Sequence, residues 1–372
     1  MPAEKSVRIA EGMGRRQPAA RADPTGIGGA EWKEMETVAD KKAARVRGLI
    51  LLIVGALILA GVLIWLNQRE NDQYREQRDQ MSEGFGTLKT IQWEGSTYRE
   101  KPAVTTLLVA GVDREGTITE TNTNSYRDGG QADFLMLLSI DHTDKKIYRL
   151  QIDRDTMTEV DILGVFGNEV GTRILQICLA HSFGATPHDN AKYTVRAVQN
   201  LLGGLEIDGY YMVDYTSVPV LNDALGGVTV EIAFDMTSVH PEWTAGSTVT
   251  LRGKEAEDFV RTRKTVGSGT NEERMIRQNE FMTKAIAQMN HKLSENLKFG
   301  DELLTALKDV SVTNFTQKRL LEEINHAYAY EILPVDYPAG EYMYGSDGFM
   351  EFHMKENAAV EWVLEHLYSK TE

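Results

Sequence analysis

The sequence predicts an α/β protein, in which strands and helices alternate to build layers, preceded by a single N-terminal transmembrane helix. Short apolar runs bounded by turn residues lie between residues 105 and 152, which is typical of strands. Segments with apolar residues at helical spacing follow, and this interleaving favours a layered domain. The third observation is an uninterrupted apolar stretch near the N-terminus. With 372 residues, the chain suffices for one large domain or two ordinary ones.

The apolar stretch at residues 48–66 contains only Gly, Ala, Val, Ile, Leu and Trp. As a helix it would span roughly 28 Å, close to the thickness of a bilayer's hydrocarbon core. A helix buried in a protein core would normally keep a polar face, and this stretch has none. A cleaved signal peptide normally has a shorter apolar region and a cleavage site with small residues after it. We therefore expect an uncleaved membrane anchor.

The charges beside this stretch predict its orientation. The basic residues immediately before it are Lys41, Lys42, Arg45 and Arg47, whereas the segment after it mixes both signs. Because basic residues favour the cytoplasmic side, residues 1–47 should form a disordered cytoplasmic tail. The later residues should then lie outside the cell membrane. A single cysteine excludes an intrachain disulfide and suits a Gram-positive type of envelope.

The formal net charge of −15 argues against binding of nucleic acid through bulk positive charge. Residues 67–100 should form a juxtamembrane stalk, because residues 67–95 are rich in Gln, Glu, Arg and Asp and predict a solvated helix. A folded domain at 101–292 and a C-terminal extension at 293–372, packed on the core, should follow.

The expected elements of these two segments follow from their apolar patterns. Strands are expected at 105–113, 134–140 and 146–152, the last two joined as an antiparallel hairpin by the polar segment 141–145. Further elements are helices at 172–183, 191–203 and 216–225, a strand at 227–232, and helices at 253–260, 271–292, 301–308, 316–329 and 356–368.

Acidic residues gather where these strands end. The hairpin places Asp133 beside Asp153, Arg154 and Asp155, and Asp113 joins them if the first strand runs parallel to the third. Two carboxylates from different strands suit Mg²⁺, which also takes phosphate oxygens and water as ligands. The alternative is that these aspartates only cap turns, where Asp is common.

Basic residues gather further along the chain. Arg261 and Arg263 point to one face if their segment is extended, and Arg274, Arg277 and Gln278 share one stripe of the following helix. Guanidinium groups converging from two elements suit a multiply charged phosphate ester. The alternative is a solvated face paired with nearby glutamates. Motifs of serine hydrolases, P-loop proteins and zinc proteases are absent from the sequence, and Cys178 with His181 on one helix makes a poor protease dyad.

Six segments in order resemble the LytR-CpsA-Psr (LCP) family of membrane-anchored phosphotransferases of the cell envelope. The resemblance covers roughly residues 101–292. The matching segments are TTLLVAGVDR, ADFLMLLSIDHTDKKIYRLQIDRDT, AHSFG, YYMVDYTSVPVLNDALGGVTVEI, LRGKEAEDFVRTRK and NEERMIRQNEF.

The resemblance implies a central mixed sheet sandwiched by helices, with an apolar groove for a polyprenyl chain and a charged end for its pyrophosphate. It also implies transfer of a polyprenyl-pyrophosphate-linked glycopolymer, of teichoic acid or capsular polysaccharide type, to peptidoglycan as a phosphodiester, with release of polyprenyl phosphate. The chain would thus be a glycopolymer–peptidoglycan phosphotransferase at the cell membrane.

The resemblance also implies roles for individual residues. Asp113 and Asp133 correspond to metal ligands, here for Mg²⁺. The positions that correspond to phosphate-binding residues are Arg154, Arg261, Arg263, Arg274 and Gln278. Among them Arg154 and Arg263 are expected to act in catalysis together with Asp155, which serves either as a general base or to orient Arg154.

Three positions depart from the family's usual pattern. Gln131 and Gln176 stand where the family usually has an arginine and a lysine, and Asp153 stands where it usually has a proline. Both glutamines are still expected at the pyrophosphate. The loss of two cations would permit one alternative function, a binding or regulatory protein that holds polyprenyl phosphates or wall glycans without turnover. A second alternative is a polyprenyl-pyrophosphate hydrolase, in which water replaces the sugar acceptor.

Overall fold

The computed structural model describes residue 62 and residues 90–114, 116–121, 128–164 and 166–371. The predicted tail at 1–47 and the predicted anchor at 48–66 lie outside these residues, except for Val62. Among the helices in the described ranges, none is both long and apolar enough to cross a membrane. From residue 90 onward, the described residues belong to one compact unit.

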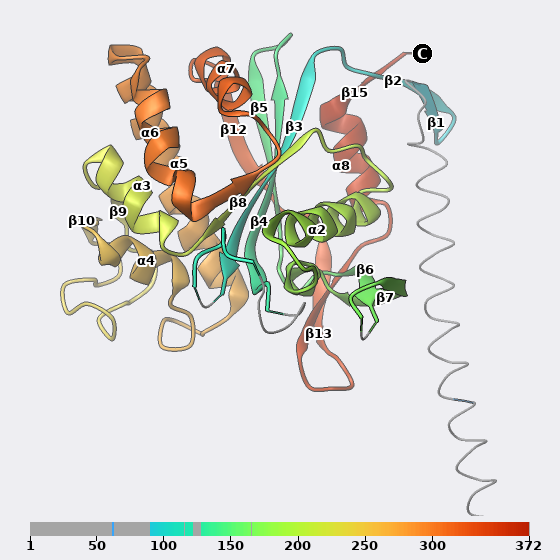
Figure 1. The fold of residues 1–372 in the computed structure, drawn as a ribbon, viewed down its shortest axis with the longest axis horizontal. Coiled ribbons are helices and arrows are strands. Elements are labelled where there is room, and N and C mark those ends of the chain that lie inside the picture. The colour runs from blue at the N-terminus through green and yellow to red at the C-terminus, as the bar shows by residue number, and fades with distance from the viewer. Residues whose placement is uncertain (1–61, 63–89, 115, 122–127, 165, 372) are drawn as a thin grey trace, which may run out of the picture. The chain divides into compact units, whose positions relative to one another are not determined.

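A six-stranded mixed sheet lies at the centre of this unit, in the order β11-β8-β3-β4-β5-β12 (Figure 1). Strand β3 pairs antiparallel with β4 and parallel with β8, and β4 pairs antiparallel with β5. At the edges, β11 pairs antiparallel with β8 and β12 pairs parallel with β5. The expected hairpin is therefore confirmed. The strands are β3 (Val104–Asp113), β4 (Gln131–Asp141), β5 (Lys146–Ile152), β8 (Gly209–Asp214), β11 (Ser311–Thr313) and β12 (Glu331–Asp336).

Helices cover both faces of this sheet, which explains why its inner strands read as almost continuous apolar runs. On β3, Leu108 and Ala110 are fully buried in a cluster with α2 (Pro187–Leu201) and α8 (Ala358–Leu367). Leu107 and Val109 point to the opposite face, toward α5 (Asn271–Glu295) and its neighbours. The expected arrangement of a mixed sheet between helices is thus present. The other helices on this second face are α3 (Ser217–Leu225), α6 (Phe299–Leu307) and α7 (Gln317–Ala327).

The segment 293–372 contributes to the sheet itself. It supplies both edge strands, β11 and β12, in addition to α8, which packs in the core. It also forms the hairpin β13 (Gly340–Tyr344) and β14 (Met350–Met354). The remaining small elements are β9 (Thr229–Glu231), β10 (Thr248–Thr250), α4 (Lys254–Arg261) and the 3₁₀ turn η2 (Lys308–Val310).

Two predictions from the sequence are wrong. The helix expected at 172–183 is strand β7 (Glu169–Gln176) followed by the 3₁₀ helix η1 (Ile177–Ser182). Strand β7 pairs with β6 (Met157–Leu163), so tertiary pairing overrides the weak helical pattern. The helical stalk is wrong for residues 90–95, because β1 (Thr90–Trp93) and β2 (Ser96–Glu100) form a hairpin completed by β15 (Tyr368–Lys370). Glu94 and Gly95 both have positive φ, as a two-residue hairpin turn requires.

Candidate active site

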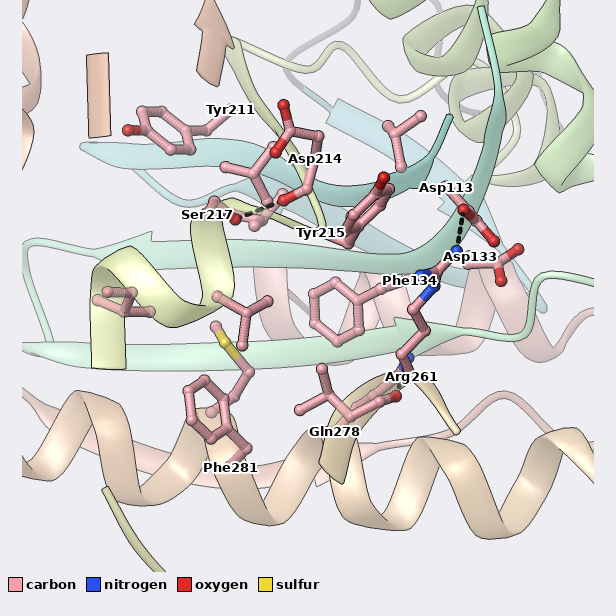
Figure 2. A pocket seen from close by; sticks show the side chains of 18 of the residues that line it. Asp113, Asp133, Phe134, Tyr211, Asp214, Tyr215, Ser217, Arg261, Gln278 and Phe281 are labelled. Carbon is pink, nitrogen blue, oxygen red and sulfur yellow. Dashed lines mark hydrogen bonds and ion pairs between the residues drawn. The ribbon is translucent and has the colours of Figure 1, made fainter. Parts of the chain in front are cut away.

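An apolar cavity of about 250 Å³ lies between the central sheet and helices α3 and α5 (Figure 2). Its walls are mostly apolar and include Val109, Phe134, Leu221 and Phe281. Three charged residues lie together at one end, where Asp113 and Asp133 are close to each other and Arg261 reaches toward Asp113. The polar residues Asp214 and Ser217 also line the cavity, away from this end. We call Asp113, Asp133, Arg261 and Arg274 the charged end of the cavity. An apolar space with charge at one end fits a ligand that has a hydrocarbon chain and an anionic head.

A second cavity of about 250 Å³ adjoins the first on the same face of the sheet. The residues that line both cavities are Val109, Tyr211, Leu221, Met282 and Leu307. The second cavity continues between the sheet and α5, α6 and α7, where it is lined by aliphatic side chains such as Ile147, Ile286 and Leu320. Together the two cavities form an apolar channel that leads away from the charged end.

A β-bulge places Asp133 at the charged end. Gly111 pairs with Phe134 and Val112 pairs with Ala132, so Asp133 is an additional residue on β4. A bulge redirects side chains, and here both Asp133 and Phe134 line the same cavity. The glycine on the partner strand permits the close approach, because a Cβ at Gly111 would lie 3.2 Å from Cβ of Phe134. Asp113, at the end of β3, lies opposite Gln131 in the same pair of strands.

Asp133 is held between two arginines. Arg154, which follows β5, forms an ion pair with Oδ1, and Nη1 of Arg274 lies 2.7 Å from Oδ2. Arg274 stands in the first turn of α5 and is buried, where its Nε and Nη2 donate to Oδ1 of Asn271 at 3.1 and 2.7 Å. Thr270 caps this helix by accepting from the backbone N–H of Glu273. The helix start therefore fixes one of the guanidinium groups at the carboxylate.

Arg261 comes from the last turn of α4 and pairs with the other carboxylate. Its Nη2 lies 2.9 Å from Oδ1 of Asp113, and its Nη1 lies 3.1 Å from Oε1 of Glu257. The guanidinium also stacks over the ring of Tyr215, at 4.3 Å from the centroid. Because Arg261 is half-exposed, its ion pairs are weak enough for an anionic ligand to replace them.

Arg263 lies two residues further on and is half-buried. Its positive charge lowers the pKa of Asp155, together with those of Arg154 and Arg274, although burial and the Asp153 carboxylate outweigh them and raise that pKa. Among the residues that the structure describes, Arg263 has no ion pair within 4 Å. Its charge is thus available to a ligand.

Arg277 differs from the arginines around it. It is buried, and its guanidinium donates to the backbone carbonyl oxygens of Phe259 and Thr262 at the end of α4. Burial and the nearby Arg274 lower its pKa to about 10. The two arginines that the sequence places on one face of α5 therefore have different roles. Arg274 faces the carboxylates, while Arg277 fixes the segment that carries Arg261 and Arg263.

The three glutamines lie at the site in different ways. Nε2 of Gln278 donates to the carbonyl of Val260 at 3.4 Å, and its Oε1 is buried beside the cavity without a protein donor in the described part of the chain. Gln131 accepts from Nη2 of Arg154 at 2.5 Å. Nε2 of Gln176 donates to Oδ1 of Asp155 at 3.2 Å and to the carbonyl of Met350 at 2.6 Å.

Cys178 completes the surroundings of Arg154, whose Nη2 lies 3.2 Å from its Sγ. The thiol is buried, and burial raises its pKa to about 12. It is therefore neutral at physiological pH and acts as a weak acceptor for Arg154. The neighbouring His181 is also fully buried and hydrogen-bonded to the carbonyl of Gly129, which leaves no catalytic dyad between these two residues.

Comparison with known proteins assigns the family. The model described as the LytR_cpsA_psr family matches residues 64–356, which is most of the chain. The chain belongs to this family. Its sequence segments, its mixed sheet and its cavity with a charged end agree with the resemblance inferred from residues 101–292.

Several curated relatives of this LytR_cpsA_psr protein carry the name polyisoprenyl-teichoic acid–peptidoglycan teichoic acid transferase TagU. The relative from Bacillus mycoides is 26% identical over 280 residues, which covers 73% of this chain and 80% of that protein. The relative from Halalkalibacterium halodurans is 31% identical over 164 residues, and this match spans 44% of this chain and less than half, 46%, of that protein.

Solved structures share the fold of this family member. Protein gbs0355 of Streptococcus agalactiae superposes with a TM-score of 0.57 at 20% identity, over 72% of this chain and 90% of the other. Bacillus subtilis TagV superposes with a TM-score of 0.52 at 21% identity, over 72% of this chain and 98% of TagV. The structure of TagT bound to LI-WTA superposes with a TM-score of 0.53 at 18% identity, over 70% of this chain and 88% of TagT.

The structure brings most of the predicted charged residues together and adds four neighbours that the sequence did not predict. Tyr215 and Glu257 contact Arg261, Asn271 holds Arg274, and Tyr342 donates to Asp153. A signal existed for Tyr215, because it follows the buried strand β8 at the same sheet edge as Asp113. For Tyr342 the only signal was the density of tyrosines in the C-terminal segment.

Proposed function

We propose that this chain transfers a polyprenyl-pyrophosphate-linked glycopolymer to peptidoglycan as a phosphodiester and releases polyprenyl phosphate. The observation that carries the proposal is the apolar channel that ends at Arg261, Arg274 and the two aspartates. Membership of the LytR_cpsA_psr family and the name of the curated relatives support it. A glycopolymer of teichoic acid type is the first choice, since that is the polymer in the relatives' name.

The channel accounts for the lipid part of this substrate. Burial of hydrocarbon contributes about 25 cal/mol for each Å² removed from water, so a polyprenyl chain gains affinity from the aliphatic walls alone. Val109, Leu221 and Leu307 line both cavities and would contact the polyprenyl chain where it passes from the first cavity into the second. The pyrophosphate then lies at the charged end, because it is the only charged part of the lipid.

The arginines account for recognition and activation of the pyrophosphate. Arg154, Arg261 and Arg274 bind carboxylates in the structure, and a phosphate group offers the same bidentate geometry with more charge. In the reaction, a hydroxyl oxygen of peptidoglycan attacks the phosphorus that bears the glycan, and the bond from that phosphorus to the bridging oxygen breaks. The hydroxyl proton passes to the surrounding water, and polyprenyl phosphate leaves with the electron pair. Arg263 and its neighbours stabilise the negative charge that develops on the phosphate oxygens.

The donor set fits Mg²⁺ as a cofactor. Asp113 and Asp133 line one end of the cavity, and a hard cation that binds one or two carboxylates completes its shell with phosphate oxygens and water. Among the described residues there is no group of three or more His, Cys, Asp or Glu side chains that could hold a metal ion. When bound, Mg²⁺ would neutralise charge on the phosphate oxygens.

Asp155 serves chiefly to orient Arg154 in this proposal. Its Oδ1 lies 3.3 Å from Nε of Arg154 and 3.2 Å from Nε2 of Gln176, so it contacts two residues that are expected at the pyrophosphate. Asp155 is buried, and burial raises its pKa. This pKa is closer to that of an effective general base than the pKa of an exposed aspartate is. Its contacts nevertheless support the orienting role more directly than that of general base.

The location of the reaction forms part of the proposal. Residues 48–66 would anchor the chain in the cell membrane, with residues 1–47 in the cytoplasm and the catalytic unit outside. This orientation gives the cavity access to lipid-linked polymer and to peptidoglycan. It also separates the unit from DNA, in agreement with the net charge of −15.

A reconstituted transfer assay tests the function. The full chain in detergent receives Mg²⁺, a labelled polyprenyl-pyrophosphate oligosaccharide and peptidoglycan fragments, and label attached to peptidoglycan is measured. We expect transfer by the wild type, loss of transfer in Asp133→Ala and Arg263→Ala, and no change in Arg99→Ala, an exposed position on β2. Release of glycan phosphate without peptidoglycan would instead identify a hydrolase. Lipid binding without any bond cleavage would identify a binding protein.

A further inference from the structure

The hairpin β13–β14, which is remote in sequence from the arginines, contacts the segment Asp153–Asp155 directly. Oη of Tyr342 on β13 donates to Oδ2 of Asp153 at 2.6 Å. The backbone N–H of Phe352 on β14 donates to the carbonyl of Asp155 at 2.8 Å, and Thr156 and Phe352 form a parallel bridge. The hairpin thus holds the turn that follows β5 from outside the sheet.

The carboxylate of Asp153 connects the hairpin to this turn. Its Oδ1 accepts from the backbone N–H of Asp155 at 2.7 Å, which forms a local turn of the Asx type, while its Oδ2 accepts from Tyr342. The carboxylate is buried, so both of its oxygens depend on these donors. Removal of the tyrosine hydroxyl would leave Oδ2 without this donor and free the side chain to rotate.

The turn in its present form directs the side chain at its centre, Arg154, into the site. From there Arg154 reaches Asp133, Gln131 and the thiol of Cys178. Burial and the Asp153 carboxylate raise the pKa of Tyr342, so the phenol keeps its proton and remains a donor at physiological pH. The ring of Tyr342 packs on Phe352 with centroids 4.9 Å apart, which fixes the hydroxyl in direction.

We propose that Tyr342 is a positioning residue, which acts through Asp153 to hold Arg154 in the orientation that binds the pyrophosphate. Tyr342 does not contact the charged end itself, so its effect passes through the turn. The proposal rests on the proposed function only in the identity of the anion. The proposal assigns the hairpin β13–β14, which is distant in sequence from the arginines, a role in pyrophosphate binding.

Binding measurements on the full chain in detergent test this role without need of transfer. The probes are a short-chain polyprenyl pyrophosphate and the polyprenol of the same length, which lacks phosphate. Tyr342→Phe keeps the ring and removes only the hydroxyl. We expect it to weaken binding of the pyrophosphate about tenfold, the equivalent of one hydrogen bond to a charged group, and to leave polyprenol binding within twofold. Tyr344→Phe, an exposed position on the same hairpin, should change neither.

A second variant separates the route from a general loss of structure. If Tyr342 acts through Asp153, the double variant Tyr342→Phe/Asp153→Asn should bind pyrophosphate no more weakly than Asp153→Asn alone. The proposal would be overturned if the two substitutions weakened pyrophosphate binding independently, so that their effects multiplied in the double variant. It would also be overturned if Tyr342→Phe bound pyrophosphate with wild-type affinity or lost affinity equally for both probes. A wild type that binds both probes equally well would overturn it too. Preference for pyrophosphate without glycan transfer would refute the proposed function and leave the positioning role to be decided by these variants.

Discussion

Nη1 of Arg274 lies 2.7 Å from Oδ2 of Asp133, although the two residues are 141 positions apart in the sequence. The other oxygen of this carboxylate pairs with Arg154, so a single aspartate joins β4, the turn after β5 and the start of α5. The carboxylate holds two cations close together before any ligand binds. This preorganisation is what a site for a pyrophosphate requires, because the cost of gathering like charges is met during folding.

Loss of the Arg274 guanidinium should reduce transfer far more than stability. In the proposed reaction Arg274→Ala removes a donor to the phosphate, and such losses cost roughly 100- to 1000-fold in kcat. The measurement is the initial rate of label transfer to peptidoglycan. Lys284→Ala, an exposed change on the same helix, is the matched control and should keep the wild-type rate. A rate in Arg274→Ala within threefold of the wild type would show that this arginine does not serve the reaction.

Removal of the metal should abolish transfer reversibly. Chelation with EDTA is expected to stop the reaction and added Mg²⁺ to restore it, because carboxylates and phosphate together would form the ligand set of the proposed metal site. Asp113→Asn removes one anionic ligand and should raise the Mg²⁺ concentration for half-maximal rate about tenfold. Titration of the rate with Mg²⁺ gives this value. Undiminished transfer after EDTA treatment would contradict a role for the cation.

Arg277 should matter for stability first. Arg277→Met leaves the carbonyls of Phe259 and Thr262 without their buried donor, which costs about 2–4 kcal/mol of unfolding free energy. Urea unfolding followed by circular dichroism measures the change. Lys284→Met, on the exposed face of α5, should stay within about 0.5 kcal/mol of the wild type. Equal stability of the two variants would show that Arg277 does not fasten the end of α4.

Stability should fall in acid partly because of His181. Burial lowers the pKa of this fully buried residue from 6.5 to about 4, so the unfolded chain binds its proton at a higher pH than the folded one. The stabilisation is complete above pH 6.5 and is lost as the pH falls toward 4, by about 3 kcal/mol. His181→Gln should flatten this part of the curve when urea unfolding is compared at pH 7.0 and 4.5. An unchanged pH dependence in the variant would place the acid sensitivity elsewhere.

The sequence predicted the part of the site that depends on neighbouring strands. The polar connection at 141–145 indicated the β4–β5 hairpin, and the hairpin brings Asp133 to the segment with Arg154. For Asp113 the prediction was conditional on β3 running parallel to β5, and the structure meets this condition, because both strands pair antiparallel with β4. Such relationships are local in the sheet, so pattern and turn chemistry suffice to predict them.

The sequence could not predict that two arginines on one face of α5 have different partners, nor that the C-terminal hairpin contacts the turn after β5. Arg274 and Arg277 are equivalent by helical periodicity, and only the packing of α4 against α5 gives them different partners. The contact between Tyr342 and Asp153 joins residues 189 positions apart and has no sequence pattern of its own. Residues 172–176 were misassigned because their strand is defined by pairing with β6.

The most direct test of the central claim is the ratio of products in one reaction. Polyprenyl phosphate released and glycan phosphate attached to peptidoglycan are quantified together by mass spectrometry, with the full chain, Mg²⁺ and a polyprenyl-pyrophosphate oligosaccharide. Transfer predicts one polyprenyl phosphate for each phosphodiester formed. Polyprenyl phosphate that accumulates with free glycan phosphate and no attached glycan would contradict the account, and so would the absence of both products.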